Sequence, residues 1–155
     1  MNYDLLIRQL RGLAAEESWY VPLLSNAAAL LYDALPDLNW AGFYLMREGA
    51  LVLGPFQGKV ACIHIPLGKG VCGAAAQLDQ TQLVPDVHQF PGHIACDSAS
   101  NSEIGIPLHK NGRVIGVLDI DSPRLSRFDE TDRAGLEGFA RALEEGLRLD
   151  PWPEK

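Results

Sequence analysis

A cysteine and three carboxylates lie close together in residues 94–121. Cys96 is in a small polar segment, IACDSAS, and Glu103, Asp119 and Asp121 are on the strand-like segments that follow. Acidic side chains are disfavoured in strands and costly to bury. Because side chains alternate across a strand, Asp119 and Asp121 point to one face, opposite their apolar neighbours. Such a face is either exposed to water or lines a polar cavity, and beside a thiol that cavity would be a reaction site.

The thiol and the acids need separate explanations. A reactive cysteine must be accessible, which suits Cys96 in its loop, whereas Cys72 beside an alanine run fits a small buried hydrophobic residue. Nearby negative charge raises the pKa of a thiol. The carboxylates are therefore better suited to holding a cationic substrate group, such as an ammonium, or to delivering a proton to a leaving oxygen. For Asp121, which borders a turn, an exposed sheet face is the alternative.

The three cysteines favour redox or nucleophilic chemistry over metal binding. Cys62, Cys72 and Cys96 are separated by nine and twenty-three residues, which match no common zinc motif, and an odd count argues against a structural disulfide framework. Each of the four histidines fits a surface or hydrogen-bonded position. A metal cluster of Cys96, His88 and His93 is the alternative, and we expect no metal and no cofactor.

Two further motifs concern ligand binding. In the strand-like run NWAGFYLM, Trp40, Gly42 and Tyr44 share one face and would form a shallow aromatic trough, unless the aromatics are simply core residues. The run GKGVCG, at residues 68–73, resembles a phosphate loop but lacks the long spacing and the hydroxyl residue after the lysine. We therefore exclude nucleotide binding.

The composition indicates an ordinary globular chain. Its 155 residues are 47% hydrophobic and 21% charged, which suits a single domain over residues 1–155. A net charge of −7 argues against binding to nucleic acid or to an anionic membrane. The N-terminus lacks the order of a signal peptide, and no apolar run reaches membrane-spanning length, so we expect a cytoplasmic protein.

The periodicities predict helices and strands in a mixed order. Ser18 is expected to cap a helix that ends near Pro36, and Asp129 to cap the last helix. Asn111 and Gly112 predict a hairpin turn. The expected elements are an N-terminal helical appendage (1–15), a helix (18–35), strands (39–46 and 50–53), a loop (54–59), a strand with Cys62 and His64 on one face (61–65), a helix (71–80), a strand (82–84), a long irregular segment (85–102), a strand hairpin (103–120), a helix (129–147) and a surface tail (150–155).

This order predicts an α+β fold. The central sheet would be mainly antiparallel, with the N- and C-terminal helices packed on one face. The other face would hold a ligand pocket under the long loop, because long loops in compact domains are usually functional.

Five phrases together resemble the GAF-fold free methionine-(R)-sulfoxide reductases: NWAGFYL, LGPFQGK, ACIHIPLGKGVCG, QLVPDVHQFPGHIACDSASNSEI and GVLDIDSP. The resemblance spans Asn26 to Asp132. It implies a single GAF domain, a homodimer, and thioredoxin-dependent reduction of free methionine-R-sulfoxide to methionine. Gly105, where a strand would favour a β-branched residue, is a minor departure that touches none of the site residues.

The resemblance also implies roles for individual residues. Cys96 would attack the sulfoxide sulfur and become a sulfenic acid, and Cys62 would resolve it as a disulfide that thioredoxin reduces. Cys72 would be a secondary or alternative resolving cysteine. The implied substrate-binding residues are Glu103, Asp119, Asp121, Trp40 and Tyr44. Because a peptide-bound residue has no α-ammonium, the carboxylates would select the free amino acid.

A ligand sensor is the rival function, because GAF folds are widely used as small-molecule sensor modules. A sensor, however, has no need of two exchangeable thiols such as Cys62 and Cys96.

Overall fold

The computed structural model describes residues 1–94 and 96–149, and the tail predicted for residues 150–155 lies outside them. A six-stranded sheet in the order β3-β2-β1-β6-β5-β4 forms the centre, and all neighbouring strands are antiparallel. The elements are α1 (Tyr3–Glu16), α2 (Tyr20–Ala34), β1 (Trp40–Arg47), β2 (Ala50–Gly58), β3 (His64–Ile65), α3 (Gly70–Leu78), β4 (Gln82–Val84), the 3-10 helix η1 (Val87–Gln89), β5 (Ser102–Lys110), β6 (Arg113–Ser122) and α4 (Glu130–Gly146). The predicted α+β fold is confirmed.

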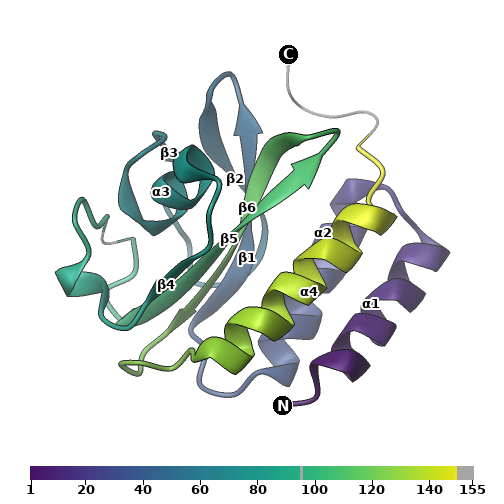
Figure 1. Cartoon of the computed structure of the whole chain (residues 1–155), viewed down its shortest axis with the longest axis horizontal. Coiled ribbons are helices and arrows are strands. Elements are labelled where there is room, and N and C mark those ends of the chain that lie inside the picture. Colours follow the sequence, from purple (N-terminus) through teal and green to yellow (C-terminus); the bar gives the residue numbers. More distant parts are fainter. Residues whose placement is uncertain (95, 150–155) are drawn as a thin grey trace.

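Helices α2 and α4 cover one face of the sheet, α1 packs against these two helices, and α3 lies on the other face (Figure 1). The helix-covered face holds the larger hydrophobic core, including Phe43, Leu118 and Phe139. Helix α1 packs into this layer through buried Tyr3, whose hydroxyl donates to Asp132 at 2.6 Å. Among the described helices, none is both long and apolar enough to cross a membrane.

Two predictions from local sequence, a hairpin turn and a helix cap, are confirmed. Asn111 and Gly112 have φ values of 54° and 74°, the left-handed pair that a two-residue hairpin loop requires. Asp129 caps α4 in a capping box with Asp132, each side chain accepting a hydrogen bond from the other residue's backbone. These contacts fix the β5–β6 hairpin and the start of α4.

The predicted Ser18 cap is wrong. Helix α2 begins at Tyr20, and the preceding Trp19 makes no capping hydrogen bond through its side chain. The backbone around Ser18 pairs instead with the segment after α4: Trp19 bridges Arg148 in parallel, and the Ser18 carbonyl accepts from the Arg148 amide at 2.8 Å. This pairing holds Ser18 outside the helix start.

Two other boundaries differ from the prediction. The segment 54–59, expected to be a loop, continues β2 as far as Gly58, because it pairs with β1 across a bulge opposite Gly42 and Tyr44. The strand expected over 61–65 is reduced to His64–Ile65. Cys62 therefore lies in an irregular segment and does not share a strand face with His64.

Candidate active site

Strand register brings the predicted acids and aromatics onto the sheet face that carries α3. Asp121 lies between Trp40 on β1 and Glu103 on β5. The next row places Asp119 between Gly42 and Gly105. The predicted alternation is confirmed, because the apolar residues between these positions belong to the core under the helices.

Both glycines beside Asp119 have close neighbours, and the approach is tighter at Gly42. A Cβ atom on Gly42 would lie 2.3 Å from the Phe56 Cβ. One on Gly105 would lie 3.3 Å from the Val71 Cγ1 of α3. The expectation that Gly105 touches none of the site residues is wrong, since it pairs directly with Asp119 and lets α3 approach the acids.

A small cavity of about 40 Å³ lies over these acids. Its walls come from β1, β3, β5 and β6, the start of α3, and the irregular segments that contain residues 60–61, 93–94 and 96–100. Of the predicted site residues, Trp40, Tyr44, Cys72, Cys96, Glu103, Asp119 and Asp121 line it. Cys62 completes the set through a bond to Cys96. This volume holds about three water molecules in the disulfide form.

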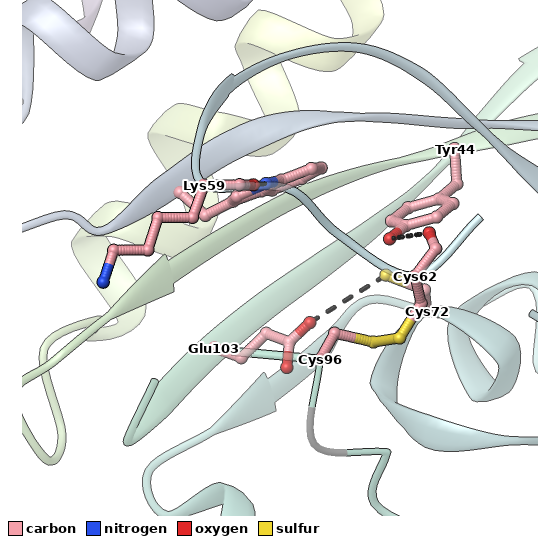
Figure 2. The surroundings of a disulfide bond; sticks show 7 residues. Tyr44, Lys59, Cys62, Cys72, Cys96 and Glu103 are labelled. Carbon is pink, nitrogen blue, oxygen red and sulfur yellow. Dashed lines mark hydrogen bonds between the residues drawn. A yellow bond between two sulfur atoms is a disulfide. The ribbon is translucent and has the colours of Figure 1, made fainter. Parts of the chain in front are cut away.

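Cys62 and Cys96 form a disulfide whose Cα atoms are 5.5 Å apart, the pairing that the resemblance implied (Figure 2). The Tyr44 hydroxyl donates to the Cys62 carbonyl at 2.9 Å and holds this segment over the sheet. Cys72 is a free, buried thiol whose Sγ donates to Glu103 Oε2 at 3.9 Å. The site therefore combines a redox pair with a third thiol that contacts a carboxyl.

The aromatic residues are both core and cavity wall. Trp40 stacks on Tyr44 with ring centroids 5.8 Å apart, and on Phe56 at 5.1 Å. The Trp40 indole donates to the Lys59 carbonyl at 3.2 Å. Sequence reasoning missed Phe56, because it assigned residues 54–59 to a loop. It therefore did not expect the Phe56 ring to stack on Trp40 of the neighbouring strand.

The carboxyls share a buried, negatively charged environment. Burial and then the nearby Asp119 and Asp121 charges raise the pKa of Glu103 well above its ordinary value, and burial followed by Asp119 does the same for half-buried Asp121. The pKa of Asp119 is also raised by burial, but hydrogen bonds from Glu103 and Cys72 oppose the rise. We conclude that Glu103 and Asp121 hold protons more readily, and that Asp119 is the preferred anion.

The Cys72 thiol is held in its neutral form. Burial, followed by the Asp119 and Glu103 charges, raises its pKa well above the ordinary value. The Cys72 Sγ and one carboxyl oxygen each from Glu103 and Asp119 lie within 4.8 Å of one another. They are the one such group of three potential metal ligands in residues 1–94 and 96–149. The alternative cluster of Cys96 with two histidines does not form there.

His88 and His93 are neighbours, with ring centroids 6.0 Å apart, whereas His109 has other partners. His93 lines the cavity, and burial followed by His88 lowers its pKa. His88 Nε2 lies 3.0 Å from Asn101 Oδ1. His109 lies between Glu144, 3.0 Å from its Nδ1, and Asp79 on its Nε2, so it joins α3, β5 and α4.

Asn39 is a site residue that sequence reasoning missed. Its side-chain amide donates to Asp97 Oδ2 and to Ser100 Oγ, each at 2.9 Å, so it holds the segment that carries Cys96. Its backbone amide also donates to the Asp121 carbonyl at 3.0 Å. The one hint in the sequence is a polar residue directly before the aromatic strand.

Known proteins are similar to this chain in sequence and in fold. A GAF domain family model matches residues 23–148. The free methionine-R-sulfoxide reductase of Escherichia coli is 52% identical over 145 residues, which cover 94% of this chain and 88% of that protein.

Two solved structures are similarly close. The protein named fRMsr from Staphylococcus aureus, solved in complex with substrate, superposes with a TM-score of 0.90 at 51% identity and covers 95% of this chain and 96% of its own. The free methionine-R-sulfoxide reductase of Neisseria meningitidis, also in complex with its substrate, gives 0.90 at 46% identity, with coverages of 93% and 87%. This chain belongs to the GAF-domain family of free methionine-R-sulfoxide reductases.

Proposed function

We propose that this protein reduces free L-methionine-(R)-S-oxide to L-methionine and is returned to its dithiol form by thioredoxin. The observation that carries the proposal is the Cys62–Cys96 disulfide beside a cavity lined by three carboxyls. The names and substrate complexes of the relatives supply the substrate. The resemblance further suggests a homodimer.

Cys96 is the attacking residue in this proposal, because it lines the cavity and Cys62 does not. The Cys96 sulfur bonds to the sulfoxide sulfur, the oxygen passes to Cys96, and methionine leaves. The resulting sulfenic acid condenses with the Cys62 thiol, which releases water and forms the disulfide. Two electrons from a dithiol then restore both thiols.

The acids bind the amino group and supply a proton. Asp119, the preferred anion, pairs with the substrate's α-ammonium. Glu103, which holds its proton more readily, donates it to the sulfoxide oxygen as that oxygen passes to Cys96. Trp40 and Tyr44 contact the S-methyl group, an arrangement that favours sulfur against an aromatic ring. A methionine sulfoxide inside a peptide lacks the ammonium and is excluded.

Cys62 is better suited than Cys72 to resolve the sulfenic acid. Cys62 is already bonded to Cys96, whereas burial and neighbouring acids keep Cys72 protonated. The thiolate is the nucleophile, so Cys72 can serve as a secondary resolving cysteine only if its burial or the charge of the neighbouring acids decreases.

NADPH consumption with thioredoxin and thioredoxin reductase tests the reaction. The free R-sulfoxide should be turned over, while its S epimer and a sulfoxide-containing peptide should not. Turnover of none of the three, starting from fully reduced protein, would favour a ligand-binding module instead.

Single-turnover experiments test the cysteine roles. Cys96→Ser should abolish methionine formation. Cys62→Ser should still form about one equivalent of methionine per subunit, because the first step needs only the attacking thiol, but thioredoxin-coupled cycling should fall. Equal single-turnover loss in both variants would contradict the assignment.

A further inference from the structure

Two exposed apolar side chains flank Cys62. Val60 is 88% exposed and Ile63 is 60% exposed, and together with Cys62 they lie in the irregular segment between β2 and β3, at one edge of the sheet. Exposed apolar side chains gathered at one place, rather than scattered singly, mark interaction sites. Here they adjoin a redox disulfide.

The backbone of this segment is fixed, so its exposure is not a result of looseness. Three of its carbonyls accept hydrogen bonds from the sheet: Lys59 from the Trp40 indole at 3.2 Å, Cys62 from the Tyr44 hydroxyl at 2.9 Å, and Ile63 from the Leu53 amide at 2.8 Å. Figure 2 shows the Tyr44 contact directly above the disulfide. A prearranged apolar surface loses little entropy when a partner covers it.

The two sulfurs of the disulfide differ in their surroundings. Cys96 lines the cavity with Glu103, Asp119 and Asp121, a set of acids that disfavours an approaching thiolate. Cys62 does not line the cavity, and its segment carries the exposed side chains of Val60 and Ile63. Attack on a disulfide proceeds at one chosen sulfur, and access decides which.

We propose that the segment Lys59–Ile63 docks a thioredoxin-class dithiol protein and presents the Cys62 sulfur to it. This inference rests on the proposed function. The partner's thiolate forms a bond to Cys62 Sγ, the Cys62–Cys96 bond breaks, and its electron pair leaves on Cys96, which takes up a proton. The partner's second thiolate then displaces Cys62 from the mixed disulfide, so the partner is oxidised by two electrons.

Ile63→Ser tests the docking surface, because Ile63 lies outside the cavity lining whereas Val60 is part of it. The matched control is Leu125→Ser, since Leu125 is 58% exposed and lies in the β6–α4 connection. In Ile63→Ser, kcat/KM for thioredoxin should fall about tenfold, the scale of a lost interface anchor. Turnover supported by dithiothreitol should be unchanged in both variants.

Several results would contradict the proposal that this segment docks thioredoxin. Thioredoxin kinetics equal to those of Leu125→Ser would show that Ile63 is not a contact, and an equal loss with dithiothreitol would show an effect on the chemistry. A change in oligomeric state, measured by light scattering, would assign the segment to a second copy of this chain. Failure of the proposed function is distinguishable, because wild type would then show no turnover with dithiothreitol.

Trapping identifies the attacked sulfur. Oxidised wild-type protein is mixed with a thioredoxin whose second active-site cysteine is replaced by serine, and the mixed disulfide is mapped by mass spectrometry. We expect the thioredoxin on Cys62. A mixed disulfide on Cys96 would overturn the assignment of the attacked sulfur.

Discussion

Glu103→Gln should stabilise the folded protein while it removes activity. Coulomb's law with an effective dielectric constant of about 20 gives ~3.5 kcal/mol of repulsion between two full charges 4.8 Å apart, the outer limit for the Glu103 and Asp119 oxygens. Glu103 relieves part of this repulsion by keeping its proton. We therefore expect Glu103→Gln to raise the free energy of unfolding by about 1 to 3 kcal/mol at pH 8, or Tm by roughly 2 to 10 °C.

The pH dependence identifies the cause. The pKa of Glu103 is raised in the folded state, chiefly by burial, so stability due to the protonated carboxyl is complete below its unfolded pKa and is lost as pH rises through its folded pKa. The amide cannot ionise, so the advantage of Glu103→Gln should be large at pH 8 and small near pH 4. Urea denaturation of the oxidised protein at both pH values measures it.

A control separates this effect from net charge. Glu16→Gln removes the same charge from an exposed position at the end of α1 and should change stability by less than about 0.5 kcal/mol at either pH. Glu103→Gln would refute the electrostatic argument if it were less stable than wild type at pH 8, or equally stabilised at both pH values. The first result would make Glu103 a structural hydrogen-bond partner.

Two other predictions follow from the geometry. Gly42→Ala should destabilise by about 2 kcal/mol or more in chemical denaturation, since its Cβ would meet the Phe56 backbone at 2.7 Å, whereas Gly12→Ala, with nothing within 4 Å, should be neutral or stabilising. Binding of the free amino acid to the reduced protein should release protons, because its ammonium lowers the raised pKa of Asp121. Calorimetry in buffers of different ionisation enthalpy measures this, and proton uptake would contradict it.

The features that the sequence predicted correctly depend on short-range rules. Alternation in β1 and β6 follows from strand geometry, and the Asn111–Gly112 turn and Asp129 cap need only a few neighbouring residues. The features that it did not predict depend on distant partners. Gly54 and Pro55 look like a loop until pairing with β1 is known, and Asn39 contacts Asp97 across 58 positions of chain. No local pattern contains such contacts.

The alternation along β1 separates two kinds of mutation. Trp40, Gly42 and Tyr44 face the site, whereas Ala41 and Phe43 face the core under the helices. Directed evolution can therefore explore new substrates by randomising Trp40 and Tyr44 with little cost to the main core. A deletion of one residue in β1 would exchange the two faces and remove fold and chemistry together.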